Sequence, residues 1–357
     1  MWYEFALVFS APVLRTDVFM VRLPPAIVYF DSLRGAPPSS TATGGPPSPK
    51  GRHFLLQRKH IMNSYIYALG FFDGVHLGHQ ALLSAVKSLA GETMGRGVVT
   101  FSGHPDTLVL GQTPGLITTA QDRERLLRRF GMDRVAALPF DRQMLATPWQ
   151  DFLDALHRDY GAAGFVCGED FRFGAKGAGT AALLGEYCRE RKLPFAAVPE
   201  QDLDGVRVSS TYIRELLSKG DMAGAVRYLG HPYVLTGQVV HGHQLGRTLG
   251  IPTANLVLPE GLAVPRFGVY ACRAAVGRKT YSAVTNIGTR PTVGGHHITV
   301  EPWLLDYDGD LYSQEITLEF YEFLRPERKF DSLEELKAAI FENAAQTRKL
   351  FGGEESR

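Results

Sequence analysis

Two histidines, His76 and His79, stand three residues apart in the glycine-rich stretch GFFDGVHLGH. The apolar run YIYALGFF that leads into it is typical of a strand, and HQALLSAVKSLAGE has the apolar spacing of a helix. In an open α/β sheet, ligands bind at the carboxyl ends of the strands, and a helix N-terminus favours phosphate. Two imidazoles at such a point can donate to phosphate oxygens as charge develops in a transition state.

Packing residues and metal ligands are the alternatives for this histidine pair. Zinc would need a third ligand and a carboxylate base with the spacing of HExxH, and the stretch does not have that spacing. Gly70 and Gly74 allow the backbone to approach a ligand closely. The pattern favours a phosphate site and leaves a structural role open.

A second polar group, VSSTYIRELL, opens another predicted helix. Ser209 and Ser210 precede this helix, and Arg214 lies one turn inside it. Taken alone, the group favours a helix cap, in which a serine oxygen accepts a backbone N–H. The functional alternative is a triphosphate site, where the hydroxyls and the guanidinium fork hold phosphate oxygens.

A third group follows in GRTLGIPTANL, in a chain that contains no GxxxxGK[ST] loop of the Walker type. Gly246 and Gly250 permit a loop whose N–H groups wrap phosphate, and Arg247 adds positive charge. Thr253 and Asn255 offer neutral oxygen atoms to Mg²⁺. Phosphoryl transfer depends mainly on positioning and charge neutralisation, so a barrel without a Walker loop can perform it.

Glu301 is the only charged residue in the predicted strand ITVEPWLL. A carboxylate in such a strand either faces solvent or takes part in chemistry. The residues alone leave both possibilities open.

The secondary structure predicted from the sequence, which must position these polar residues, changes in pattern near Gly230–Tyr233. From residue 64 to this point strands and helices alternate, which predicts a parallel sheet covered on both faces. Residues 234–322 contain short β-rich runs separated by Gly, Pro, Asn and Asp, which predicts an antiparallel barrel or sandwich. A single helix then ends the pattern. We therefore expect one domain at residues 63–230 and another at residues 233–352.

The segment before Met62 differs in composition from the rest. Twelve of the fifteen residues from Ala36 to Lys50 are Pro, Ser, Thr or Gly, a composition typical of disorder. We expect residues 1–62 to be a disordered or non-native N-terminal extension, with Met62 as the natural start. A genuine flexible tail is the alternative.

Composition excludes several classes of protein. The chain has 357 residues, a formal net charge of +1, and 45% apolar and 21% charged residues, so no broad basic field indicates nucleic-acid binding. Three widely spaced cysteines are typical of unlinked thiols in a reducing cytoplasm. The sequence has no continuous apolar run of membrane-spanning length, and we expect no secretory signal.

The motifs together resemble one family, the prokaryotic bifunctional riboflavin kinase/FMN adenylyltransferase (FAD synthetase). GFFDGVHLGH, TFSGHP, GEDFRFG and SSTYIREL occur in the order of its nucleotidyltransferase module, and GRTLGIPTANL, NIGTRPT, TVEPWLLD and LRPERKF resemble its kinase module. TFSGHP departs from the commoner form TFxPHP, although His104 and Pro105 still align. The resemblance covers nearly everything after Met62 and implies a Rossmann-like α/β domain, then an antiparallel β-barrel with a C-terminal helix.

The resemblance also implies a role for each motif residue. Glu301 would be the base that takes the proton from the riboflavin 5′-hydroxyl, and His76 and His79 would be the catalytic pair of adenylyl transfer. ATP or phosphate would be bound by Gly70, Phe72, Asp73, Gly74, Ser209, Ser210, Thr211, Arg214, Gly246, Arg247 and Gly250. Flavin would be bound by His104, Pro105, Asp170, Phe171 and Arg325, and Mg²⁺ by Thr253 and Asn255.

The resulting expectation is a cytoplasmic enzyme with two active sites. The barrel would convert riboflavin and ATP to FMN, and the α/β domain would join FMN to a second ATP to give FAD and pyrophosphate. Riboflavin, FMN and ATP would be its partners, without nucleic acid or membrane, in a monomer or weak homo-oligomer. A single-activity nucleotidyltransferase with a structural barrel, and a non-catalytic flavin-binding protein, are the alternatives.

Overall fold

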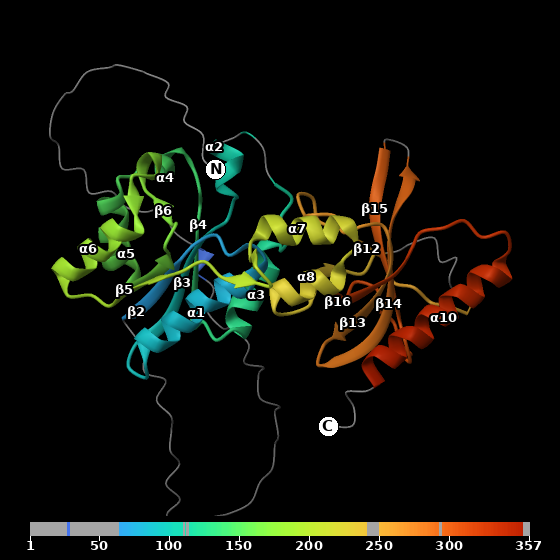
Figure 1. The fold of residues 1–357 in the computed structure, drawn as a ribbon. Coiled ribbons are helices and arrows are strands. Elements are labelled where there is room, and N and C mark those ends of the chain that lie inside the picture. Colours follow the sequence, from blue (N-terminus) through green and yellow to red (C-terminus); the bar gives the residue numbers. More distant parts are fainter. Residues whose placement is uncertain are drawn as a thin grey trace, which may run out of the picture.

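The computed structural model describes residues 27–28, 64–109, 111, 114–240, 250–292 and 295–352 (Figure 1). Apart from residues 27–28, the predicted N-terminal extension lies outside these described residues, and its disorder stays a prediction. Two separate six-stranded sheets organise the described part, one in each half of the chain.

The N-terminal half is built on a mainly parallel sheet with the strand order β1-β4-β3-β2-β5-β8. Its strands are β1 (Ile27–Val28), β2 (Tyr65–Leu69), β3 (Gly95–Phe101), β4 (Arg134–Leu138), β5 (Ala162–Gly168) and β8 (Phe195–Val198). All pairings are parallel except that of β1 with β4. The predicted alternation of strand and helix is therefore confirmed.

Helices cover both faces of this sheet, because successive residues of β2 enter different cores. Tyr67 and Leu69 pack in a core with residues of α5 and α6, whereas Ile66 and Ala68 pack in one with residues of α1 and α3. The helices are α1 (Leu77–Ala90), α2 (Pro105–Val109), α3 (Ala120–Arg129), α4 (Arg142–Ala146), α5 (Trp149–Tyr160) and α6 (Ala181–Arg191). Short elements complete the half: η1 (Asp73–Val75), β6 (Arg172–Phe173), η2 (Ala175–Gly177), β7 (Gly179–Thr180), β9 (Asp202–Leu203) and β10 (Val206–Arg207).

The strand order places a topological switch at β2. From β2 the chain moves outward to β3 and β4, and then returns to β5 on the other side of β2. The connection that follows β2 and the connection that follows β5 therefore run in opposite directions along the sheet. Their divergence opens a crevice at the carboxyl ends of these strands. The stretch from Gly70 to His79 starts where β2 ends, so it lies at this crevice.

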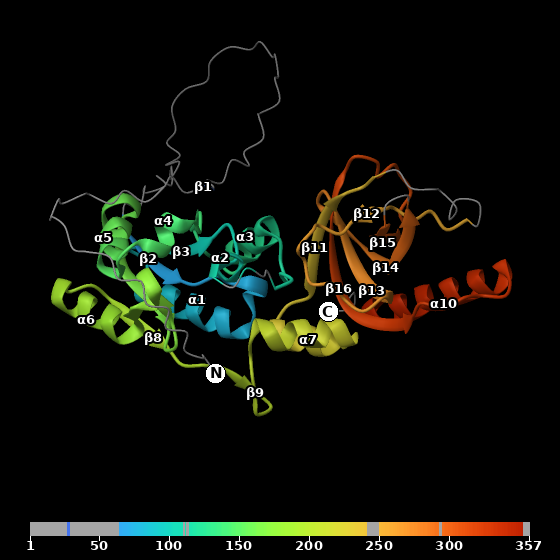
Figure 2. The ribbon, with the colours of Figure 1, turned by 90° about the horizontal axis from the view of Figure 1, so that it is seen from above.

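The C-terminal half is an antiparallel sheet with the order β11-β16-β13-β14-β15-β12. Its strands are β11 (Tyr233–Gln238), β12 (Leu256–Val257), β13 (Gly268–Val276), β14 (Lys279–Thr292), β15 (Gly295–Leu304) and β16 (Glu315–Pro326). An isolated bridge between Val240 and Asn255 joins the segment after β11 to the segment before β12, so the sheet closes almost completely into a barrel. The C-terminal helix α10 (Leu333–Gly352) lies outside the barrel (Figure 2).

Helices α7 (Ser210–Lys219) and α8 (Met222–Leu229) lie between the two sheets (Figure 1). Their apolar residues, such as Leu217 and Leu229, belong to the same buried cluster as Tyr270 and Phe320 of the barrel. Backbone bonds add to this contact: the Leu116 N–H donates to the Gly261 carbonyl at 2.7 Å. The two halves are thus joined by a continuous apolar core as well as by the chain.

Leu217→Ala should therefore lower the stability of both halves together. The Leu217 side chain is fully buried in the shared cluster, so its truncation should cost about 2–5 kcal/mol of unfolding free energy. Thermal inactivation of the two activities, followed in one sample, should shift by the same amount. Leu333→Ala, at a leucine that is 62% exposed, is the matched control with an expected change below about 0.5 kcal/mol. If the thermal inactivation of only one of the two activities shifted in Leu217→Ala, the result would contradict a core shared by both halves.

Candidate active sites

The loop after β2 holds its backbone in an unusual conformation. Phe72, Gly74 and Val75 have φ angles of 61°, 78° and 42°. The left-handed region is ordinary for glycine but disfavours a β-branched residue such as Val75, so surrounding contacts must hold the loop. The loop delivers His76 to the start of α1.

Asp73 connects this loop to two other elements. Its carboxylate is buried and accepts backbone N–H bonds from Ile117 at 2.9 Å and Thr118 at 3.1 Å. Arg214 of α7 donates to the same carboxylate at 2.8 Å through Nη2, and to the Gly115 carbonyl through Nε at 2.6 Å. Two residues predicted to bind phosphate, Asp73 and Arg214, are therefore paired with each other.

His76 and His79 form a stacked pair at the N-terminus of α1. His76 is the N-cap, and its Nδ1 accepts the backbone N–H of His79 at 3.3 Å. An Nδ1 that accepts must lack a proton, so in the neutral ring the hydrogen lies on Nε2 and is available as a donor. The two ring centroids are 3.7 Å apart with an interplanar angle of 17°.

Burial keeps both imidazoles neutral at pH 7. It lowers the pKa of His76 to about 4, with further lowering by the nearby His231 and Arg214. Burial and the stacked His76 lower the pKa of His79 well below its usual value. The pair therefore offers N–H donors to an anion without carrying a full positive charge. Within the described part of the chain, His79 Nδ1 is buried without a hydrogen-bond partner.

The two serines at the start of α7 bond to the protein itself. Ser209 is the N-cap and accepts the Tyr212 N–H at 3.2 Å, which is the helix-cap role that the sequence alone favoured. The Ser210 hydroxyl donates to the Asp73 carbonyl at 3.0 Å. Thr211, the next residue, is exposed.

The predicted flavin residues of the first half follow β3 and β5, the two neighbours of β2. His104 stacks edge-on against Phe71 with ring centroids 4.6 Å apart, and Pro105 begins α2. Asp170 pairs with Arg207 at 2.9 Å, and the Phe171 ring stacks on a neighbouring phenylalanine. These residues thus lie at the same edge of the sheet as the histidine pair.

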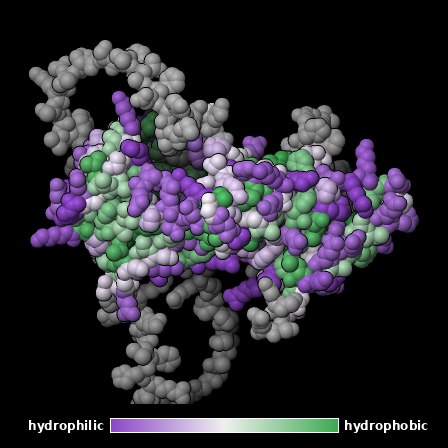
Figure 3. Space-filling model, in the orientation of Figure 1, coloured by the Kyte–Doolittle hydropathy of each residue, from purple (hydrophilic) through white to green (hydrophobic). Residues whose placement is uncertain are grey.

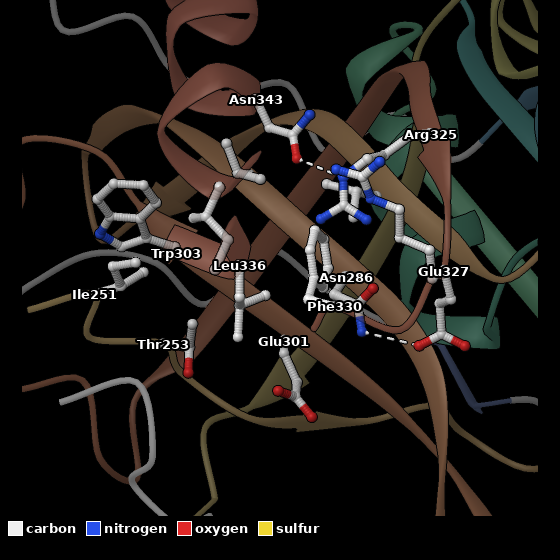
Figure 4. Close-up of a pocket in the computed structure, with 14 residues that line it drawn as sticks. Ile251, Thr253, Asn286, Glu301, Trp303, Arg325, Glu327, Phe330, Leu336 and Asn343 are labelled. Carbon is white, nitrogen blue, oxygen red and sulfur yellow. Dashed lines mark hydrogen bonds between the residues drawn. The ribbon is translucent and has the colours of Figure 1, made fainter. Parts of the chain in front are cut away.

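The barrel contains a cavity of about 380 Å³ lined by Glu301 and Thr253 (Figure 4). Figure 4 shows the Thr253 hydroxyl and the Glu301 carboxylate toward one end of the cavity, with Arg325 and Asn343 toward the other. The Thr299 hydroxyl donates to Glu301 at 3.1 Å, and Arg325 Nε donates to Asn343 at 2.9 Å. Its apolar lining residues are Ile251, Val269, Val284, Trp303, Phe330, Leu336 and Ile340.

A second cavity of about 400 Å³ also has Thr253 in its lining, with Gly250 and the loop from Tyr307 to Tyr312. Thr253 thus lines both cavities, and Glu301 lines the first. Asn255 lines neither, and its carbonyl accepts the Val240 N–H at 2.8 Å. The predicted contacts of Gly246 and Arg247 lie outside the described residues.

Sequence reasoning missed several residues that the fold brings to these sites. Asn286 lies opposite Glu301 in the β14–β15 register and lines the first cavity, as does Asn343 from α10. Trp303, for which the sequence favoured a core role over a flavin contact, lies two residues beyond Glu301 on the same strand and also lines this cavity. The period of two in a strand could have placed Trp303 beside Glu301, but no local signal marks Asn343.

The metal alternative for the histidine pair finds no support in the described residues. There, no three His, Cys, Asp or Glu side chains are grouped so that they could hold a metal ion. Within the same residues no helix is long and apolar enough to cross a membrane. Figure 3 shows hydrophilic and hydrophobic residues interspersed over the face in view.

Comparisons with known proteins match both halves. A riboflavin kinase family model matches residues 229–351, and an FAD synthetase family model matches residues 58–212. The bifunctional riboflavin kinase/FMN adenylyltransferase of Escherichia coli K12 is 38% identical, covering 85% of this chain and 97% of that protein. The enzyme of that description from Listeria monocytogenes is 33% identical, covering 80% and 92%. A crystal structure described as a macrolide-efflux protein from Streptococcus pneumoniae is 30% identical, with a TM-score of 0.72 over 80% of this chain and 94% of that one.

Acid should destabilise the folded chain through His76. In the unfolded state the His76 side chain binds a proton below about pH 6.5, whereas in the folded state the buried ring binds one only below about pH 4. The free energy of unfolding therefore decreases as the pH falls from about 6.5 to about 4. At pH 5 the loss from this ring should be about 2 kcal/mol. Urea unfolding of wild type and His76→Asn at pH 7.5 and pH 5 measures it, because asparagine still caps the helix.

His157→Asn, at an exposed histidine, is the control and should keep the wild-type difference between the two pH values. If the unfolding free energy of His76→Asn still differed between pH 7.5 and pH 5 as much as that of the wild type, His76 would not be the group responsible.

Proposed function

The chain belongs to the bifunctional riboflavin kinase/FMN adenylyltransferase family, and from this premise we propose which residues perform each of its two reactions. The C-terminal barrel phosphorylates riboflavin with ATP to give FMN and ADP. The N-terminal domain transfers the adenylyl group of a second ATP to FMN, giving FAD and pyrophosphate. The observation that supports the residue assignment is that Thr253 and Glu301 line one barrel cavity, while the histidine pair lies at the start of α1 beside the end of β2.

Adenylyl transfer takes place at the carboxyl edge of the parallel sheet. A phosphate oxygen of FMN attacks the α-phosphorus of ATP, a new P–O bond forms, and the bond to pyrophosphate breaks. The attacking phosphate is already an anion, so no strong base is needed. The task of the protein is to stabilise charge on the α-phosphate and on the leaving pyrophosphate.

The histidine pair is suited to this task. The Nε2–H of His76 is oriented by the helix cap, and the N-terminus of α1 adds free backbone N–H groups beside it. We assign His76 and His79 to the phosphates of ATP, together with Gly70, Phe72 and Gly74 of the loop.

Other residues support this loop or complete the substrate sites. Asp73 and Arg214 position the loop by pairing with each other, and Thr211, Ser209 and Ser210 complete the ATP site. Flavin is assigned to His104, Pro105, Asp170 and Phe171.

Phosphoryl transfer takes place beside Thr253, which lines both barrel cavities. Riboflavin is assigned to the mainly apolar cavity beneath α10, and ATP to the cavity beside Tyr307–Tyr312, which Gly250 lines. Gly246 and Arg247 are assigned to the ATP phosphates from the motif alone. Glu301 takes the proton of the 5′-hydroxyl as its oxygen attacks the γ-phosphorus, and ADP leaves. Arg325, at the far end of the first cavity, is assigned to the flavin ring system.

Thr253 and Asn255 carry the neutral oxygen atoms that a hard cation such as Mg²⁺ accepts. Thr253 lines both barrel cavities, whereas Asn255 lines neither. We assign the metal to Thr253 and Asn255. When bound, the ion would neutralise phosphate charge.

The remaining expectations concern the whole protein. We propose that the functional units span residues 63–230 and 233–352, that residues 1–62 contribute to neither reaction, and that the enzyme works in the cytoplasm as a monomer or weak homo-oligomer. Removal of residues 1–61 should then leave both activities unchanged.

His76→Ala should abolish FAD formation and leave FMN formation intact. The substitution removes the oriented Nε2–H donor, and loss of one such donor typically costs about 100- to 1,000-fold in kcat. Chromatographic separation of FMN from FAD after incubation with riboflavin, ATP and Mg²⁺ reads both reactions at once. Equal loss of the two products from a folded variant would refute separate sites.

Glu301→Gln should produce the reverse pattern, because the amide cannot accept the 5′-hydroxyl proton. FMN formation should fall by about 100-fold or more, whereas FAD formation from supplied FMN should stay at the wild-type rate. Glu327→Gln tests a second carboxylate of the same cavity, which bonds Asn286, and should keep most of the kinase activity. A kinase rate unaffected by Glu301→Gln would remove this residue from the mechanism.

A further inference from the structure

Three consecutive carbonyl groups of the strained loop accept hydrogen bonds from three different elements. The Asp73 carbonyl accepts the Ser210 hydroxyl at 3.0 Å, and the Val75 carbonyl accepts Gln80 Nε2 at 2.9 Å. The Gly74 carbonyl lies 2.9 Å from His231 Nε2. Every peptide carbonyl of η1 is therefore held in place immediately before His76.

Two of these side chains also hold the junction between the halves. The second hydrogen of Gln80 Nε2 goes to the Leu229 carbonyl at 2.7 Å, at the end of α8. His231 Nδ1 lies 2.7 Å from the Pro232 carbonyl, next to the first residue of β11. The same pair of side chains thus ties the loop to the segment that enters the barrel.

His231 is suited to this place because each of its ring nitrogens lies within hydrogen-bond distance of a carbonyl oxygen. The neutral ring carries one hydrogen, and with that hydrogen on Nε2 it donates to the Gly74 carbonyl. Burial lowers the pKa of His231, and the two carbonyls oppose this effect. The charged or titratable groups around it are Arg129 of α3, Glu319 of β16 and His76.

The loop cannot keep its conformation without such contacts. Val75 has a positive φ that a β-branched residue avoids, and a left-handed backbone of this kind persists only when its surroundings impose it. Release of the Gly74 and Val75 carbonyls would let the loop relax and move the ring of His76. A misplacement of about 1 Å at a reacting centre can cost about 100-fold in rate.

We propose that Gln80 and His231 are positioning residues for adenylyl transfer: they hold Asp73–Val75 in the conformation that directs His76, and they fix it to the entrance of the barrel. This inference rests on the proposed role of His76. Neither residue lines the described cavities of the barrel, so the kinase reaction of the same molecule serves as an internal reference.

The test uses the full chain with His231→Leu, Gln80→Leu and His231→Arg. In both leucine variants kcat for FAD formation should fall about 10- to 100-fold, while KM for ATP and the kinase rate change by less than about threefold. His231→Arg should keep adenylyl transfer near the wild-type rate, because a guanidinium N–H can also donate to the Gly74 carbonyl. His157→Leu is the matched control: its Nδ1 also lies 2.7 Å from a carbonyl, that of Ala162, and its loss should leave both rates unchanged.

An unchanged kcat for FAD formation in both leucine variants would overturn the proposal. An equal loss of FAD and FMN formation would also overturn it, because such a loss indicates that the two residues have a purely structural role. If His231→Leu does not fold, Gln80→Leu and His231→Arg decide by the same measurements. His76→Ala is measured in parallel. If it retains FAD formation, the assignment of His76 has failed; if it loses activity while the leucine variants do not, only the positioning role has failed.

Discussion

The left-handed loop from Phe72 to Val75 is the constraint on which the adenylyl-transfer half depends. It turns the chain from the central strand β2 into α1 and brings His76 to the cap of that helix. The conformation costs free energy, since Val75 is β-branched. Contacts from α7, α1, the 115–118 segment and the module junction offset this cost. Donors that are held in place in this way can stabilise developing charge without reorganising.

Charge is handled differently in the two halves. In the N-terminal half, the Asp73 carboxylate forms an ion pair with Arg214 and neutralises its charge. Burial keeps the stacked imidazoles of His76 and His79 neutral. Imidazole N–H groups and the N-terminus of α1 can still bind a phosphate there as dipoles. In the barrel, by contrast, Glu301 and Thr253 line a cavity that substrate can enter. This contrast is consistent with one reaction that starts from an existing phosphate anion and another that must remove a proton.

The junction between the halves is more than a linker. Helices α7 and α8 follow the parallel sheet in sequence, but their buried residues pack with the barrel core. The first of these helices carries Ser210 and Arg214 at its N-terminal end, while its C-terminal end receives the Arg266 N–H at the Leu217 carbonyl, 2.9 Å away. The barrel therefore supports the helix whose N-terminal end bonds to Asp73 and the loop around it.

The sequence by itself determined the family, the two chemistries and the class of each half, because motif spacing and hydrophobic period are local properties. It also predicted the position of the histidine pair at a strand end and the helix-cap role of Ser209. Only the tertiary structure decided that Arg214 meets Asp73, 141 residues away, that Ser210 bonds the loop, and that His231 reaches Gly74 across 157 residues. No local pattern encodes these contacts, because the packing of α7 and the barrel against the sheet brings them together.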